Sequence, residues 1–288
     1  MREVAVINGR VADPERAAVP IDDWGFRYGW GAFDTIRVHK SCPLFLERHL
    51  GRLCQAASVL MLTGSIDQTL PLWSRDVRRS IERAGAREAF INLYWTGRQS
   101  MKSGESLRLV RVRKLNSYPR RAARLWVAPW RIEPTYPGVA AKTLAYFPYI
   151  FAGVMAREAG FDEALILNTS NRVADGGASS VFVISAGQVV TPSLREGTLA
   201  GITRGLVLEL AAKQGLEVRQ GRIRWKDLAG AEGVFVTSAL RGVVPVSRIA
   251  DQWSGRTERL PRFRALQDAY RQEVADEVRR WRARCARS

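Results

Sequence analysis

Hydrophobic and polar positions follow two periods along the chain, and each period predicts one kind of element. Residues 32–38 alternate with a period of two, so Phe33, Thr35 and Arg37 share one face of a predicted strand. Helical spacing of apolar residues recurs at 49–60, 67–84, 202–215 and 263–281. Shorter apolar runs predict strands at 4–7, 43–47, 89–95, 107–112, 124–128, 188–192, 234–237 and 243–249. Helices and strands are therefore mixed along the whole chain.

The stretch from Val139 to Ser185 organises the chain, because it places a lysine and an acid on neighbouring elements. Lys142 opens the stretch, a helical pattern follows to Gly160, and residues 162–168 and 179–184 are predicted strands. Asp175 lies between these strands and precedes two glycines. Desolvation by apolar neighbours would favour the neutral amine that Schiff-base chemistry needs. A solvated lysine and an Asp-Gly-Gly turn are the simpler interpretation.

A third candidate feature is the helix that begins at Gly201-Ile202-Thr203-Arg204. The first N–H groups of a helix have no partner within the helix and carry the positive end of its dipole, so they can bind an anion. An ordinary helix N-terminus without a ligand explains the same sequence. Arg52, early in the predicted helix 49–60, has a similar alternative as a solvated arginine.

Length and composition indicate a globular chain with one large or two medium domains, since 46% of its 288 residues are hydrophobic. The proline-rich segment 130–137 is the strongest linker signal. We therefore predict a small N-terminal domain over 1–129, a linker over 130–137 and a larger C-terminal domain over 138–288. No apolar run approaches the roughly 20 residues of a membrane helix, and no signal-peptide pattern opens the chain, so we expect a cytoplasmic protein without membrane contact.

The net charge of +17 suggests nucleic-acid binding. However, arginines are scattered over nearly every segment, and the densest cluster is Arg279 to Arg287 at the C-terminus. This distribution favours a composition bias, so a nucleic-acid-binding protein is kept only as a remote alternative. Three cysteines and two histidines without metal-ligand spacing predict no metal site.

Several short motifs, taken in their order along the chain, resemble those of a known family. They are Asn8-Gly9, Tyr28 to Arg37, His49-Leu50-Gly51-Arg52-Leu53, Lys142-Thr143-Leu144-Ala145-Tyr146, Glu158 to Ala164, Leu199 to Arg204 and Pro245-Val246. Together they resemble the class IV aminotransferases, which are pyridoxal 5'-phosphate enzymes of fold type IV. The resemblance implies an α+β fold, with a small N-terminal α/β domain, a larger C-terminal domain around a β-barrel, and the cofactor between them. It also implies a homodimer.

The resemblance assigns roles to individual residues. Lys142 would be catalytic, forming a Schiff base with pyridoxal phosphate and moving the substrate proton, and Asp175 would pair with the pyridine nitrogen. Leu199 would pack on the ring and Tyr146 would reach its phenolic oxygen. The phosphate would be held by Arg52, Ile202, Thr203 and the Ser238-Ala239 turn. The candidates for substrate binding are Tyr28, Phe33, Arg37, Arg98 and Arg241.

Some positions depart from the family pattern. Asp175 stands where glutamate is usual, Ala145 where asparagine is usual, and Thr96-Gly97 where Arg-Gly is common. The family includes branched-chain and D-amino acid aminotransferases and also aminodeoxychorismate lyase. We expect transamination between an amino acid and a 2-oxo acid, with the lyase as the alternative. Ser238-Ala239-Leu240 favours the lyase, whereas the breadth of the family favours the aminotransferase.

Overall fold

The computed structural model describes residues 1–62, 66–97, 106–115, 117–118 and 121–286. The chain forms two compact units. The first unit comprises Met1–Ser117, Ala141–Tyr146 and Val274–Ser288, and the second comprises Tyr118–Ala140 and Phe147–Glu273. Lys142 therefore belongs to the first unit, although it lies beyond the predicted linker in sequence.

The elements of the first unit are β1 (Val4–Ile7), β2 (Arg10–Ala12), α1 (Trp24–Tyr28), β3 (Gly31–His39), β4 (Cys42–Pro43), α2 (Leu46–Val59), α3 (Ile66–Ala84), β5 (Glu88–Thr96) and β6 (Arg108–Lys114). The strands of the second unit are β7 (Ala123–Ile132), β8 (Glu163–Asn168), β9 (Val173–Gly176), β10 (Ser180–Ser185), β11 (Gln188–Pro192), β12 (Val218–Gly221), β13 (Gly233–Ser238), β14 (Gly242–Ile249) and β15 (Trp253–Ser254). Its helices are α4 (Phe147–Glu158), α5 (Ile202–Lys213) and the short 3-10 helices η1 (Leu194–Glu196), η2 (Trp225–Gly230) and η3 (Thr257–Arg259). Helix α6 (Pro261–Cys285) contributes residues to both units.

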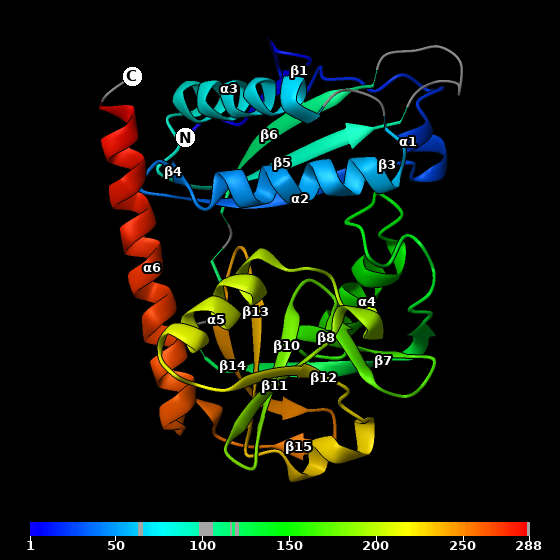
Figure 1. Cartoon of the computed structure of the whole chain (residues 1–288). Coiled ribbons are helices and arrows are strands. Elements are labelled where there is room, and N and C mark those ends of the chain that lie inside the picture. Colours follow the sequence, from blue (N-terminus) through cyan, green and yellow to red (C-terminus); the bar gives the residue numbers. More distant parts are fainter. Residues whose placement is uncertain (63–65, 98–105, 116, 119–120, 287–288) are drawn as a thin grey trace. The chain divides into compact units, whose positions relative to one another are not determined.

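The first unit is built on an antiparallel six-stranded sheet with the order β2-β1-β6-β5-β3-β4. Helix α2 packs on β3, helix α3 packs on β1 and β6, and the two helices contact each other (Figure 1). One face of the sheet is therefore covered. The period of two predicted for β3 is confirmed, because Ala32, Asp34, Ile36 and Val38 are buried while the alternate residues are partly exposed.

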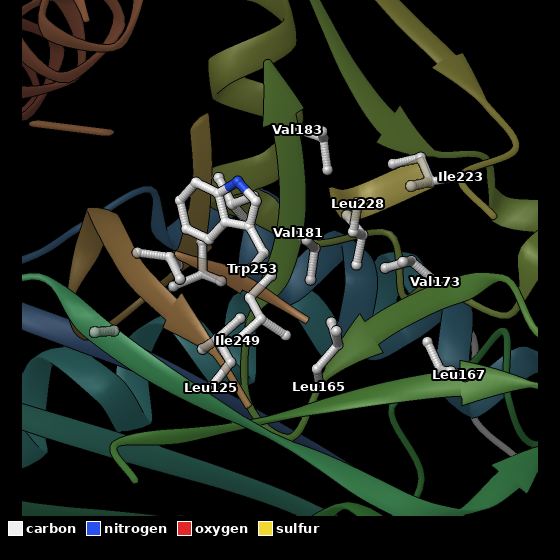
Figure 2. Close-up of a cluster of buried hydrophobic side chains, with 14 of the residues drawn as sticks. Leu125, Leu165, Leu167, Val173, Val181, Val183, Ile223, Leu228, Ile249 and Trp253 are labelled. Atoms are coloured by element: carbon white, nitrogen blue, oxygen red, sulfur yellow. The ribbon is translucent and has the colours of Figure 1, made fainter. Parts of the chain in front are cut away.

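The second unit is built on a nine-stranded sheet that runs along β12-β11-β10-β13-β14-β7-β8-β9, with β15 paired to β14. The sheet curls back on itself, since β9 contacts β10 and β11, and the N–H of Val173 donates to the carbonyl of Ile223 over 2.8 Å. Figure 2 shows the apolar interior enclosed by this barrel. Every second residue of the strands enters it, as Leu165 and Leu167 of β8 and Val181 and Val183 of β10 do. The α+β expectation with a β-barrel is confirmed.

The division between the units differs from the predicted linker at 130–137. Strand β7 extends to Ile132 and is hydrogen-bonded between β8 and β14, so it belongs to the barrel. Its pairing with β8 shifts between Val127 and Arg131, where Pro129 cannot donate a backbone hydrogen bond. The prolines of the predicted linker, Pro134 and Pro137, lie in turns that follow β7 within the second unit, and the chain first crosses between units after Ser117.

Most predicted elements are confirmed within one to three residues at their ends. The predicted strand 43–47 is wrong beyond Pro43, because Phe45 adopts a left-handed backbone with φ of 55° and α2 begins at Leu46. In the described ranges, no helix combines the length and apolar character needed to cross a membrane. The same ranges contain no group of three His, Cys, Asp or Glu side chains that could hold a metal ion.

Candidate active site

The segment Ala141–Tyr146, which carries Lys142, is attached to the beginning of β3. The N–H of Phe33 donates to the Lys142 carbonyl over 2.9 Å, and the N–H of Leu144 donates to the Gly31 carbonyl over 2.7 Å. Thr143 forms an isolated antiparallel bridge with Ala32. These backbone bonds fix Lys142 beside a strand that lies more than a hundred residues earlier in the sequence.

Two aromatic rings surround the amine of Lys142. Its Nζ lies 4.3 Å from the centre of the Phe33 ring and 4.6 Å from the centre of the Tyr146 ring. The two rings meet edge to face, with 5.0 Å between their centres. The apolar setting predicted for Lys142 is thus found, and the structure brings together three of the predicted site residues.

Arg52 contacts two residues that the sequence analysis did not assign to the site. Its Nε and Nη2 donate to the two oxygens of Asp34, each over 2.8 Å. Nδ1 of His49, one helical turn before Arg52 on α2, lies 2.7 Å from Oδ1 of Asp34. Asp34 and His49 are almost completely buried. We call these three residues the Asp34 cluster.

The cluster shifts the pKa values of its members in a consistent way. Burial alone would raise the pKa of Asp34, but Arg52 and His49 hold it well below its usual range. Burial lowers the pKa of His49, and the positive charges of Arg52 and Lys142 act in the same direction against the opposing effect of Asp34. At neutral pH the cluster therefore contains a carboxylate, a guanidinium and a neutral imidazole.

Asp175 lies on strand β9, paired with Ile166 of β8, and not in the turn that was the simpler interpretation of Asp-Gly-Gly. Its Oδ2 accepts a hydrogen bond from the N–H of Leu199 over 2.9 Å. Its Oδ1 is buried and has no hydrogen-bond partner among the residues that the structure describes. Burial raises the pKa of Asp175 to about 7. The structure thus brings together Asp175 and Leu199, two predicted site residues.

The N-terminus of α5 begins at Ile202 and Thr203, as predicted, with Gly201 in the N-cap position. Gly201 has no side chain that could cap these N–H groups, and a Cβ at this position would lie 2.9 Å from Oγ of Ser180. Arg204 has a structural role, because its Nη2 donates to the Pro192 carbonyl over 2.8 Å and to Oε1 of Gln220 over 2.9 Å. The geometry leaves the first turn of α5 suited to an anion.

Ser238 ends β13, and its Oγ accepts from the N–H of Arg241 over 3.3 Å, so the hydroxyl closes the turn to β14. Ala239 lies in the same turn. The neighbouring Thr237 has a buried hydroxyl without a hydrogen-bond partner in the described ranges, and the sequence analysis did not single it out. Two consecutive hydroxyl residues, Thr237 and Ser238, at the end of β13 were the available signal.

The remaining predicted substrate residues lie on different segments of the chain. Tyr28, at the end of α1, is 59% exposed. Arg37 lies 4.0 Å from Glu88 across the sheet. The guanidinium of Arg241 lies 5.6 Å from the centre of the Tyr118 ring. Arg98 falls outside the described residues.

Thr96, which replaces a common arginine of the family pattern, has a buried hydroxyl that donates to Asp23 over 2.5 Å. Asp23 in turn caps α1 by accepting from the N–H of Phe26. The replacement therefore stabilises the start of α1 and gives no cation for a substrate carboxylate.

Known proteins match the chain along most of its length. The family model described as "Amino-transferase class IV" matches residues 31–249. The branched-chain-amino-acid aminotransferase of Pseudomonas aeruginosa is 27% identical over 84% of this chain and 83% of its own. The aminodeoxychorismate lyase of Bacillus subtilis is 27% identical over 96% of this chain and 98% of its own.

A solved structure, the T.th. branched-chain amino acid aminotransferase with pyridoxamine 5'-phosphate, has a TM-score of 0.84. It is 25% identical and the match covers 95% of this chain and 94% of that chain. The family match spans both units and includes β3, the Lys142 segment and β9 to β14. The chain belongs to the class IV aminotransferase family.

Proposed function

We propose that the chain is a pyridoxal 5'-phosphate-dependent aminotransferase that moves an amino group between an amino acid and a 2-oxo acid. The observation that carries the proposal is the buried Asp175 carboxylate, whose Oδ1 lacks a partner among the described residues. A buried carboxylate gains most from a cationic hydrogen-bond donor, and a protonated pyridine nitrogen is such a donor. Family membership supports the same cofactor.

The other proposed contacts suit the remaining groups of pyridoxal phosphate. Nζ of Lys142 would bond to its aldehyde carbon with loss of the aldehyde oxygen as water, and the hydroxyl of Tyr146, whose ring lies next to that amine, would reach the phenolic oxygen. The N–H groups of Ile202 and Thr203, which have no acceptor within α5, would donate to the phosphate, together with Arg52 and the Ser238-Ala239 turn. Leu199, whose N–H already contacts Asp175, would pack on the ring.

When bound, pyridoxal phosphate supplies an electron sink for the charge that develops at the substrate Cα. The chain would then supply acid-base chemistry. Nζ of Lys142 would hold and move the proton of the substrate Cα. Phe33 and Tyr146 would keep the amine in an apolar setting and restrict its position.

Reduction with borohydride followed by peptide mass spectrometry tests the attachment. We expect pyridoxal phosphate to become fixed to the Lys142 peptide of the wild type and to be absent from that peptide in Lys142→Ala. Lys213→Ala, which changes the last residue of α5, serves as the control and should retain the adduct. Attachment to another lysine, or none in the wild type, would contradict the proposal.

The lyase remains the second candidate, because the alignment with the Bacillus subtilis lyase covers 96% of this chain at 27% identity. Incubation with leucine, valine, isoleucine and a panel of other L- and D-amino acids, each with 2-oxoglutarate or pyruvate, separates the two reactions. An aminotransferase produces the exchanged amino acid. Release of pyruvate and 4-aminobenzoate from aminodeoxychorismate, without any exchange, would favour the lyase.

We further propose that the protein is a homodimer located in the cytoplasm. An apolar stripe on α4 supports the dimer: Phe147, Ile150, Phe151, Val154 and Met155 are each between 37% and 71% exposed. These residues recur at helical spacing, so they form one face of α4. A contiguous apolar surface of this kind is typical of a protein–protein contact.

A further inference from the structure

The Asp34 cluster places charged groups in the protein interior, where their removal from water costs free energy. Asp34 has 0% exposure, and its carboxylate receives donors from Arg52 and His49 of α2. The backbone N–H of Thr35 lies 2.6 Å from the same Oδ1. Replacing a buried ion pair by packed apolar residues is often neutral or stabilising, so stability alone does not account for the cluster.

The geometry limits the movement of Arg52. Bonds from Nε and Nη2 to the two oxygens of one carboxylate fix the plane of the guanidinium, so the rotamer entropy of Arg52 is already lost before a ligand binds. His49 then holds Oδ1 of Asp34 from the preceding turn of the same helix. His49 therefore fixes the position of the Asp34 carboxylate, and the carboxylate in turn fixes the guanidinium of Arg52.

We propose that Asp34 and His49 are positioning residues that orient Arg52 to bind the phosphate monoester of the cofactor. The inference rests on the proposed function, in which Arg52 contacts that phosphate. The carboxylate cancels the charge of the guanidinium, so Arg52 contributes a directed donor more than net charge. This has a measurable consequence: removing the negative charge of Asp34 weakens phosphate binding instead of strengthening it.

The experiment compares the Kd of pyridoxal 5'-phosphate with the Kd of pyridoxal, which lacks the phosphate, for the full chain freed of cofactor. The ratio of the two Kd values reports the phosphate contact, and a general loss of structure changes both. We expect Asp34→Asn and His49→Leu to lose roughly tenfold or more of the wild-type preference for the phosphorylated form. His49→Asn should largely retain it, because its amide N–H can replace the Nδ1 donor.

Asp76→Asn is the matched control. Asp76 is also a buried carboxylate of the first unit, is paired with Arg75 and Arg108, and lies on α3 instead of α2. Its variant should keep the wild-type preference.

An unchanged or increased phosphate preference in folded Asp34→Asn would overturn the inference. If that variant does not fold, equal preferences in His49→Leu and His49→Asn would overturn it. A wild type that binds neither ligand contradicts the proposed function itself, and a wild type that binds pyridoxal phosphate but shows no change in the variants contradicts only the positioning role.

Discussion

Asp34 and Asp175 are both buried aspartates, yet their environments shift the two pKa values in opposite directions. Asp34 meets a guanidinium and an imidazole donor, so its pKa falls below the usual range despite its burial. Asp175 meets the N–H of Leu199 and has an unpaired Oδ1 within the described residues, so burial dominates and its pKa rises to about 7. The partners of each carboxylate, and not its residue type, decide which one is ready for a cationic ligand.

Asp175→Asn should stabilise the cofactor-free protein at high pH. Because the folded pKa of Asp175 is above the unfolded value, the native state binds more protons between pH 4 and 7 and loses stability as the pH rises through that window. We expect the variant to gain on the order of a few kcal/mol at pH 8 relative to wild type and almost nothing near pH 4. Denaturant unfolding at both pH values measures this, and a gain that does not depend on pH would contradict the assignment.

Asp34→Asn should show the opposite dependence. The folded pKa of Asp34 is depressed, so its stabilisation is present above the unfolded value and is lost as the pH falls through the folded value. At pH 7 the variant removes the buried negative charge that pairs with Arg52 and should lose about 3–5 kcal/mol of stability. Urea unfolding from pH 5 down to pH 2 should show this deficit shrinking with acid, because the loss begins only below the unfolded pKa of about 4.

At the scale of elements, the Lys142 segment and the start of β3 depend on glycines that permit close approach. A Cβ at Gly31 would lie 2.6 Å from the Leu144 side chain and 2.7 Å from the Trp95 carbonyl. Gly29 adopts a φ of 68°, and a Cβ there would lie 2.9 Å from the backbone of Ala145. The glycines at 29 and 31 thus allow residues 141–146 to pack on β3, which fixes where Lys142 lies.

Gly31→Ala should therefore displace the Lys142 segment and cost about 1–3 kcal/mol. Gly51→Ala on α2 is the control, since a Cβ there meets nothing within 4 Å and alanine favours a helix by roughly 0.5–1 kcal/mol. Thermal unfolding measures both changes. Borohydride labelling of Lys142 should decrease only in Gly31→Ala, and undiminished labelling would show that the close approach is not required.

At the scale of the whole molecule, the exposed apolar stripe of α4 and the net charge of +17 are the features that concern partners. Many arginines are already engaged in ion pairs, such as Arg121 with Asp162 and Arg172 with Glu196. Scattered and partly paired charge is expected to attract polyanions without specificity. Adsorption to nucleic acid should therefore fall steeply between 50 and 200 mM salt, with no preference for sequence.

Ile150→Glu tests the proposed homodimer. Ile150 is 59% exposed in the middle of the α4 stripe, so a charge there should leave the fold intact and oppose burial against a second copy. Light scattering after size exclusion should give a dimer mass for wild type and a monomer or a concentration-dependent mixture for the variant. Glu158→Gln, at the end of the same helix, should remain dimeric.

The sequence by itself determined the helices, the strands and the family, because short-range patterns of residues specify them. The period of two in β3, the apolar face of α5 and the ordered motifs around Lys142 and Asp175 depend on neighbouring residues, so the elements and the family could be predicted. The roles of individual site residues stay predictions.

Only the tertiary structure decided which of these residues meet. The contacts of Asp34 with His49 and Arg52 join a strand to a helix, and Lys142 reaches Phe33 across more than a hundred residues. Asp175 proved to lie on a barrel strand, and the first three residues of the expected linker, 130–132, belong to β7, which pairs with β8 and β14. Such contacts form when distant segments bury apolar surface together, and no local pattern of residues encodes which segments those are.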